Sequence, residues 1–441
     1  MIGLMMVNTA LADDTATNKI YNAKSIMLPN AMQVVVVENP RTPAVTHMVW
    51  YKIGGADEVM GESGLAHYLE HLMFKGTDLV DSGDFSKKVK SWGGNDNAFT
   101  SWDFTAYFQT VPKDKLESVM IMESDRMKNL KLDDAEALTE RDVVIQERKQ
   151  RTDSNPSAQL SEAMRAAMYI NHPYARPIIG WDAEIQNLTP DLARAFYKKY
   201  YAPKNAILVV SGDVDAKDVF EKAGKYYGSI ENDGALTRPD WPEVADVYGQ
   251  SLIVHKHASV KQPVWRRTYR MPSLGQDYQK ALALTVADNI IGGNTGRLYQ
   301  SLVVDQKLAS AASFYYSGVS VDDGSASIGV TPMEGVGSSQ IDMAIEAVLN
   351  DVAQNGVTDD EIAKAVSKLQ DESVYERDSL TGPAMMLGYQ LASGLTLDQA
   401  ERWVHDLEGV TAGDVQQIVV DYLVSTSDKY HAVTGHLVPA E

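Results

Sequence analysis

Residues 64–77 read GLAHYLEHLMFKGT, in which His67 and His71 stand four positions apart and Glu70 directly precedes the second histidine. Side chains four apart lie one turn apart on one face of a helix, and Glu70, three positions after His67, shares that face. Two imidazoles can therefore hold a divalent metal while a carboxylate stands beside its open position. Zinc suits this arrangement, because imidazole nitrogens bind it well and a catalytic zinc keeps one position for water.

The H-x-x-E-H order of these residues is the inverse of the H-E-x-x-H order of other zinc sites. With 9 His among 441 residues, chance would place the pattern in a chain of this length on the order of 0.01 times. A single histidine in such a helix is usually capped or solvated, and that is the alternative interpretation here. The combination of two histidines with a glutamate favours a metal site.

A catalytic metal site needs a third ligand, and the best candidates lie in residues 138–149, which read LTERDVVIQERK. Glu140 and Glu147 are two helical turns apart on one stripe of an expected helix. One carboxylate could bind the metal while the other orients a ligand imidazole. Glutamate-rich helix faces are more often simply solvated, and the spacing does not choose between the two residues.

These motifs together resemble the pitrilysin, insulysin and mitochondrial processing peptidase family of zinc metallopeptidases, especially its bacterial periplasmic half-size members. The resemblance extends from about Ala23 to the C-terminal end. It is carried by His67-Tyr68-Leu69-Glu70-His71 with Phe74-Lys75-Gly76-Thr77, by Gly93-Gly94 and Asn97-Ala98-Phe99-Thr100, and by Glu140 with Glu147. The resemblance implies one zinc ion per chain with His67, His71 and Glu147 as ligands, Glu70 as general base, and Glu140 as the carboxylate that orients a ligand.

The family resemblance also implies how a substrate is held. Residues 97–100 and 104–111 are expected to form two strands joined by a turn, and a plain hairpin is the simplest interpretation. In the family, the strand with Asn97, Ala98 and Phe99 is a sheet edge whose free backbone groups pair with an extended substrate. Such β-addition binds the main chain and has little regard for side chains.

The expected fold class is α+β, with two tandem homologous domains, each a mostly antiparallel sheet faced by helices. The evidence is an internal repeat: the segment from Leu188 to Gly212 and the segment from Val410 to Gly435 have the same order of threonine, helix, tyrosine and strand. A repeat this long indicates a domain duplication rather than a solenoid. Asp, Pro and Gly are frequent in residues 231–250, which indicates a linker. The predicted division is residues 1–18 as a loose N-terminus with the remnant of a signal peptide, 19–230 as the catalytic domain, 231–249 as the linker and 250–441 as the non-catalytic domain.

The second copy lacks the metal motif. Its expected helix Tyr278–Ile291 contains no histidine. His255 and His257 are two apart on an expected strand, so they could share one face and bind a metal. No matching carboxylate is near them in sequence, and we interpret them as surface residues.

Composition excludes several classes of protein. The chain has no Cys, which excludes disulfides, thiolate nucleophiles and Cys-ligated zinc. The absence of Cys also excludes the S-ribosylhomocysteine lyases, which have a similar H-x-x-E-H stretch but need a cysteine ligand. The net charge of −20 argues against a nucleic-acid partner, since no basic stripe is present. After the N-terminal segment, no apolar run reaches the length of a membrane span.

The first twelve residues are apolar and end in Ala10-Leu11-Ala12 before Asp13-Asp14. This pattern is typical of the end of a signal peptide with a small-residue cleavage site. The basic start of such a peptide is missing, because no Lys or Arg precedes Lys19. We interpret the segment as a truncated export signal and expect a periplasmic protein. The alternative is an ordinary N-terminus on a cytoplasmic protein.

The predicted function is a zinc-dependent endopeptidase that cleaves unfolded peptides or short polypeptides in a closed chamber. Family members often place an Arg and a Tyr from the C-terminal part against the substrate, and residues 324–342 contain neither. This departure predicts a dimer, with a heterodimer favoured, in which a metal-free homologue supplies the pair. The alternative function is a non-enzymatic scaffold or partner subunit, as in respiratory-complex core subunits, but there the metal motif is degraded.

Overall fold

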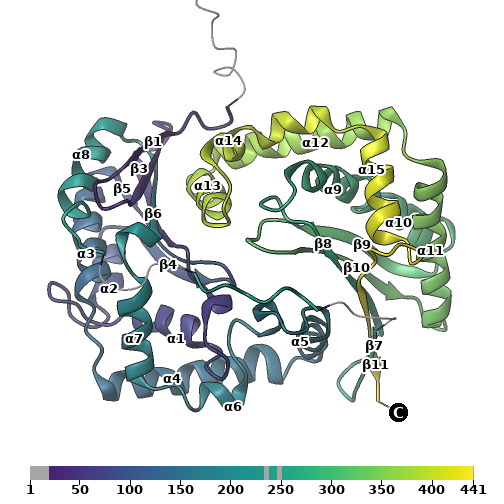
Figure 1. Ribbon diagram of the computed structural model, residues 1–441, viewed down its shortest axis with the longest axis horizontal. Helices are drawn as coiled ribbons and strands as arrows, with labels where there is room; N and C mark the ends of the chain where they lie inside the picture. The colour runs from purple at the N-terminus through teal and green to yellow at the C-terminus, as the bar shows by residue number, and fades with distance from the viewer. Residues whose placement is uncertain (1–18, 233–237, 246–250, 441) are drawn as a thin grey trace, which may run out of the picture.

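The computed structural model describes residues 19–232, 238–245 and 251–440. These residues form two halves, each built on one β-sheet with helices against it (Figure 1). The predicted export signal lies outside the described residues. No helix among the described residues is long and apolar enough to cross a membrane.

The first sheet has six strands in the order β1-β2-β6-β3-β5-β4. Its strands are β1 Lys24–Met27, β2 Gln33–Glu38, β3 Ala44–Tyr51, β4 Asn95–Thr100, β5 Thr105–Pro112 and β6 Ala206–Gly212. Only the pairing of β2 with β6 is parallel. The sequences QVVVVE in β2 and AILVVSG in β6 are apolar at consecutive positions, because both faces of the sheet centre are buried.

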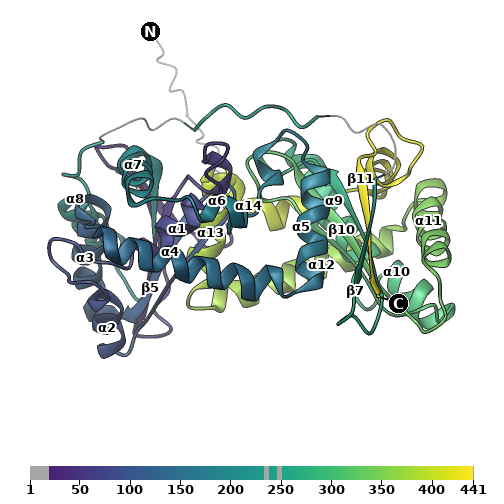
Figure 2. The same ribbon diagram turned by 90° about the horizontal axis from the view of Figure 1, so that it is seen from below.

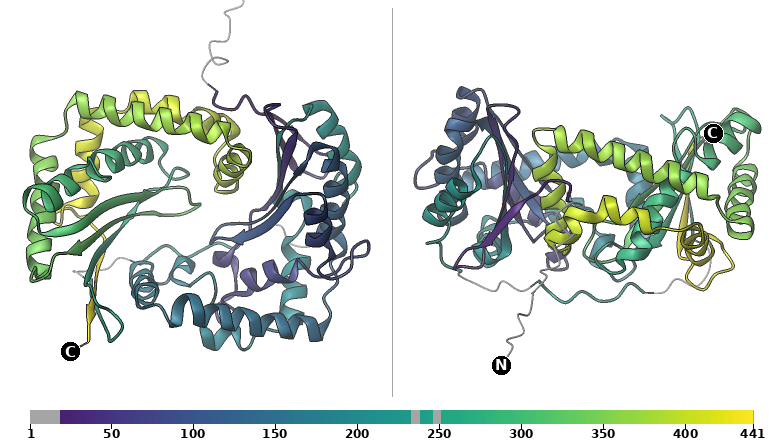
Figure 3. Two further views of the ribbon diagram at one scale, coloured as in Figure 1. Left: turned by 180° about the vertical axis from the view of Figure 1, so that it is seen from behind. Right: turned by 90° about the horizontal axis from the view of Figure 1, so that it is seen from above.

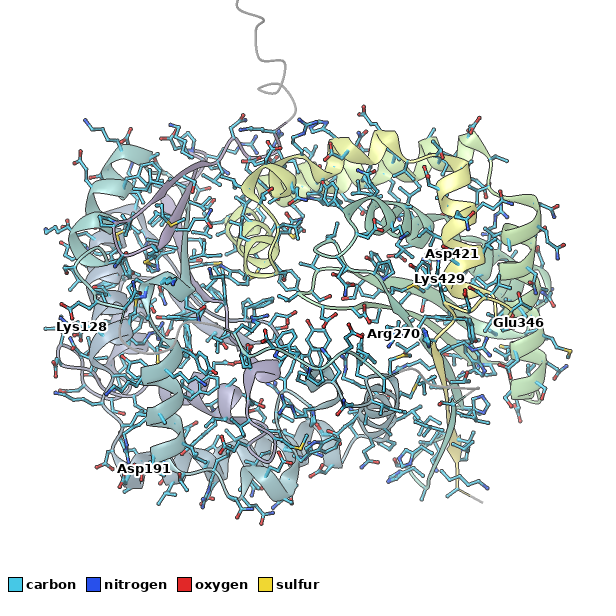
Figure 4. All side chains as sticks on the ribbon, in the orientation of Figure 1. Lys128, Asp191, Arg270, Glu346, Asp421 and Lys429 are labelled. Carbon is cyan, nitrogen blue, oxygen red and sulfur yellow. The ribbon has the colours of Figure 1, made fainter. Side chains whose placement is uncertain are left out.

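The helices of the first half lie mainly against one face of this sheet, apart from α5 (Pro156–Met168), which reaches the second half. They are α1 Leu65–Leu72, α2 Asp84–Ser91, α3 Leu116–Asn129, α4 Asp134–Arg148, α5 Pro156–Met168, α6 Asp182–Ile185, α7 Pro190–Tyr200 and α8 Ala216–Tyr226. Thr189 caps α7: its side chain accepts a hydrogen bond from Leu192 N, and Pro190 occupies the first helical position. Lys128 and Asp191 project from the outer helices of this half, away from the second half (Figure 4).

The second sheet repeats the arrangement of the first. Its strands are β7 Ser251–His257, β8 Val264–Met271, β9 Ala309–Ser317, β10 Gly324–Pro332 and β11 Ala432–Pro439, in the order β7-β11-β8-β10-β9. Again only one pairing, β7 with β11, is parallel. This order matches β2-β6-β3-β5-β4 strand for strand, so the predicted α+β fold with two homologous domains is confirmed. The helices of this half are α9 Tyr278–Ile291, α10 Arg297–Tyr299, α11 Ser338–Asn355, α12 Asp359–Asp378, α13 Gly382–Ala392, α14 Leu397–Asp406 and α15 Ala412–Ile418.

The two halves exchange one helix each, which the sequence did not predict. Helix α5 follows α4 across to the second half and packs against β7 and β11 (Figure 2). In the opposite direction, α13 returns to the first half and packs against β3 and β6, as the yellow-green helices of Figure 3 show. Ala384 and Leu387 of α13 join the apolar cluster of Trp50 on that face. Each sheet is therefore covered in part by a helix that comes from the other half.

Candidate active site

Helix α1 places the H-x-x-E-H residues, and its start is set by backbone geometry. Gly64 lies before the helix with a φ of +89°, and a Cβ on it would meet the carbonyl oxygen of Ile179 at 2.5 Å. No side chain of its own caps this end. Instead the buried carboxylate of Glu58 accepts hydrogen bonds from Gly64 N (3.1 Å) and Ala66 N (2.8 Å). The Glu58 carboxylate thus accepts hydrogen bonds from backbone N–H groups at the helix start, which have no acceptor within the helix.

The apolar face of α1 is buried, with Leu65, Leu69 and Leu72 in the core of the first half. The hydroxyl of Tyr68 donates to the carbonyl oxygen of Ala137 (2.6 Å) and so ties α1 to α4. The two helices cross with their polar faces toward each other. His67, Glu70 and His71 therefore lie near Glu140 and Glu147.

Three side chains converge on one point. The Nε2 atoms of His67 and His71 lie 3.8 Å and 3.3 Å from Oε2 of Glu147. Their three candidate ligand atoms lie within 4.8 Å of one another, and among the described residues no other group of His, Asp or Glu side chains meets this condition. Two ligands each about 2.0–2.1 Å from a tetrahedral zinc would stand roughly 3.3 Å apart. The spacing therefore fits a zinc ion.

The protonation state of His67 also fits a metal ligand. Burial lowers the pKa of His67 to about 3, so its ring is neutral at pH 7 and can act as a ligand. Burial alone would lower the pKa of His71 as well, but its hydrogen bond with Glu140 and the neighbouring carboxylates raise it above its ordinary value. Its Nδ1 lies 2.8 Å from Oε1 of Glu140. In the tautomer with the proton on Nδ1, that bond leaves the lone pair of Nε2 directed at Glu147 and the shared point.

Glu140 is itself held by a third residue. Its second oxygen, Oε2, accepts a hydrogen bond from Lys75 Nζ at 2.7 Å. The hydrogen bond from His71, followed by the one from Lys75, outweighs burial and lowers the pKa of Glu140 to about 2. The carboxylate is thus ionised at neutral pH and suited to orient the ring of His71.

Glu70 lies beside the shared point and is 9% exposed. The hydroxyl of Thr100 donates a hydrogen bond to its Oε2 at 2.6 Å, which connects the carboxylate to β4. Burial raises the pKa of Glu70 above its ordinary value, although the bond from Thr100 opposes this. A buried carboxylate next to a metal position is the arrangement that a general base requires.

The predicted substrate strand borders the same site. β4 is at the edge of the first sheet, where β5 is its only partner among the described strands. Asn97, Ala98 and Phe99 line a cavity of about 740 Å³ together with the three converging residues and Glu70. Ile178 and Ile179 also line this cavity. The structure thus brings all the residues of the predicted site to one cavity or its border.

Three contributing residues were not predicted. Thr100 supports Glu70, Lys75 supports Glu140, and Arg151 contacts Glu147 with its Nη1 2.8 Å from Oε1. Lys75 and Arg151 each stand four positions after a residue of the site. That helical spacing is the signal that could have identified them.

Three further histidines, His172, His255 and His257, have structural contacts. His172 is buried, and its Nε2 lies 3.0 Å from Oδ2 of Asp322 in the second half. His255 and His257 do share a strand face, but His255 bonds to Gln159 of α5 and His257 to Ser259. None of the three belongs to a metal-binding group among the described residues.

Two duplicated sheets with an inverted-motif site define the class of the two-domain zinc peptidases. Comparison with known proteins supports this class. Residues 33–182 match the family "Insulinase (Peptidase family M16)", and residues 187–369 match "Peptidase M16 inactive domain". The chain is 34% identical over 323 residues to the zinc protease PqqE of Helicobacter pylori, which covers 72% of each chain. The chain belongs to peptidase family M16, so the family predicted from the motifs is confirmed.

Further relatives carry the same description. An uncharacterized zinc protease of Streptomyces coelicolor is 28% identical over 366 residues, covering 80% of this chain and 77% of that protein. The crystal structure of a protease from Helicobacter pylori superposes with a TM-score of 0.84 at 28% identity, over 95% of this chain and 99% of the other. Family and relatives together support a zinc peptidase.

Proposed function

We propose that this protein is a zinc-dependent endopeptidase that cleaves unfolded peptides or short polypeptides held as an added β-strand. The observation that carries the proposal is the convergence of His67, His71 and Glu147 beside Glu70. This group opens into the cavity that the edge strand β4 borders. A metal position, a base and a strand edge are thus adjacent.

The residues of the site have separate roles in metal binding and proton transfer. His67, His71 and Glu147 would hold one zinc ion, and Glu140 keeps the ring of His71 in its binding orientation. When bound, zinc would polarise the scissile carbonyl and make a water molecule a better nucleophile. Glu70 accepts the proton of the attacking water and then delivers it to the leaving amine. Thr100 keeps Glu70 turned toward the cavity through its hydrogen bond.

Substrate binding rests on main-chain groups of β4. An extended peptide that pairs with Asn97, Ala98 and Phe99 would lie along the cavity with a carbonyl near the metal position. Strand pairing of this kind requires an unfolded segment and tolerates varied side chains. Unfolded peptides are therefore the expected substrates, and folded domains are expected to resist.

The partner is a second part of the proposal. Residues 324–342, which include β10 and the start of α11, contain neither Arg nor Tyr. A homologous metal-free subunit would supply these groups and complete a chamber over the cavity. Isolation of the chain from the cells that produce it tests this idea. We expect a homologous second subunit to co-purify, whereas a fully active preparation of this chain alone would contradict it.

The test of the proposed function compares metal and activity. The purified chain should contain one zinc per molecule, and together with its homologous subunit it should cleave an unstructured peptide. A chelator should abolish this cleavage until zinc is returned. Activity that is absent with the metal present, both alone and with the homologous subunit, would favour the scaffold function instead. Cleavage that survives complete removal of metal would refute zinc catalysis.

A further inference from the structure

The two oxygens of the Glu147 carboxylate have different neighbours. Oε2 faces the imidazoles, 3.3 Å from Nε2 of His71, whereas Oε1 lies 2.8 Å from Nη1 of Arg151. The Glu147 side chain is 16% exposed and that of Arg151 is 73% exposed. One oxygen is thus bound from the solvent side while the other is directed at the metal position.

The backbone around Arg151 is held in place. Helix α4 ends at Arg148, and a π-helical turn, Lys149–Asp153, continues the chain. Arg148 fixes the start of this turn, since its buried guanidinium pairs with Glu162 at 2.9 Å and donates to the carbonyl oxygen of Gly180 at 2.6 Å. π-helical turns inside helices are frequent at functional sites. Here the turn begins two residues after Glu147 and carries Arg151.

We propose that Arg151 is a positioning residue for the metal carboxylate, holding Oε1 of Glu147 so that Oε2 faces His67 and His71 before a metal binds. This inference rests on the proposed function. A carboxylate rotates easily about its last torsion, so without a partner it would sample orientations that direct neither oxygen at the imidazoles. The pair of Glu147 with Arg151 parallels the pair of His71 with Glu140: in each, a charged partner binds the atom that is turned away from the metal position.

Removal of Arg151 has two opposing effects on the affinity for zinc. The positive charge of Arg151 repels a cation, so its removal could strengthen metal binding. Because most of the Arg151 side chain is exposed, solvent and salt screen that repulsion. The ordering of a mostly buried carboxylate is not screened in this way, and loss of a partner that orients a ligand typically weakens metal binding about 10- to 100-fold. We therefore expect the loss of carboxylate ordering to outweigh the loss of charge repulsion, so that removal of Arg151 weakens zinc binding.

The test measures zinc binding by the full chain in competition with a chromophoric chelator, and needs no substrate. We expect Arg151→Gln to weaken zinc binding about 10-fold and to speed zinc loss to the chelator. Arg151→Lys keeps a donor and the charge, and should recover part of the affinity. The control is Lys149→Gln, which removes the same charge from an exposed position of the same turn and should bind zinc like the unaltered chain.

Three outcomes would overturn the inference. Zinc binding by Arg151→Gln that is unchanged or tighter would show that the ordering effect is absent. An equal loss in Lys149→Gln would assign the effect to net charge. A raised KM with unaltered zinc affinity would make Arg151 a substrate contact instead. If the zinc-loaded chain proved not to be a peptidase, the proposed function would fail while the zinc measurement on Arg151 still stood.

Discussion

At the scale of single residues, the roles within the H-x-x-E-H motif follow from small differences in environment. Glu70 and Glu147 line the same cavity as His67 and His71, yet the partners of the two carboxylates differ. Thr100 donates to Glu70, which lies deep in the cavity wall, whereas Arg151 pairs with Glu147 at the rim. Glu147 faces both imidazoles and so suits a ligand, while Glu70 stands beside them and suits a base.

Replacement of Glu70 tests the base. Glu70→Gln keeps the size and the hydrogen bond of the side chain but cannot accept a proton. We expect zinc content to be unchanged and kcat to fall about 100- to 10,000-fold. Peptide cleavage and elemental analysis of the same preparation measure both. Turnover equal to that of the unaltered chain would refute the assignment of Glu70.

Replacement of Glu147 tests the ligand. Glu147→Ala removes one of three protein ligands, so the purified variant should contain little zinc and show no peptidase activity. Elemental analysis after dialysis gives the metal content. Glu136→Ala, on an exposed part of the same helix, is the matched control and should retain zinc. A Glu147 variant with full zinc occupancy would exclude this residue as a ligand.

At the scale of helices and strands, the exchange of α5 and α13 joins the two halves. A Cβ on Gly388 of α13 would collide with the ring of Trp50 in β3. A Cβ on Gly435 of β11 would likewise collide with the side chain of Met164 in α5. Neither glycine has a positive φ, so space rather than backbone conformation requires them. Each exchanged helix is thus seated where a glycine leaves room for a large side chain.

We therefore expect Gly388→Ala to destabilise the protein. An added methyl group would collide with the fully buried ring of Trp50, and overpacking of a core costs about 1–3 kcal/mol. This should exceed the gain of about 1 kcal/mol in helix propensity. The control is Gly224→Ala in α8, where a Cβ meets nothing within 4 Å and a small gain in stability is expected. Thermal unfolding measures both, and an equal gain in both variants would contradict the packing argument.

The start of α12 should show a pH-dependent contribution to stability. Glu361 completes the cap with Thr358, and its hydrogen bonds with Arg297 lower its pKa from 4.5 to about 2. A depressed carboxyl pKa stabilises the folded state above pH 4.5, and this contribution is lost as pH falls toward 2. Because the carboxylate is 30% exposed, we expect only about 1–2 kcal/mol.

The measurement is denaturant unfolding of Glu361→Gln and the unaltered chain at several pH values. The difference in unfolding free energy should be largest near pH 6–7 and shrink between pH 5 and 3. Asp360→Asn, at the exposed neighbouring position, serves as the control for loss of charge. A difference that stays constant over this pH range would contradict the linkage.

At the scale of the whole molecule, the predictable parts were those encoded locally. His67, Glu70 and His71 lie within one helical turn and a half, so their spacing alone predicted the site, and the duplication predicted two similar sheets. Glu147 needed the family resemblance, because its spacing from Glu140 does not say which one binds the metal. The helix exchange was not predictable: an apolar face on α13 shows that it is buried, but not against which sheet. The elements expected at residues 97–100, 104–111 and 278–291 agree with β4, β5 and α9 to within two residues at each end.

The most direct test of the account is anomalous diffraction at the zinc absorption edge from crystals of the zinc-loaded chain. We predict a single peak between α1 and α4, about 2.0–2.2 Å from Nε2 of His67, Nε2 of His71 and Oε2 of Glu147. A peak at any other place, or zinc bound without Glu147 in an active preparation, would contradict the central claim.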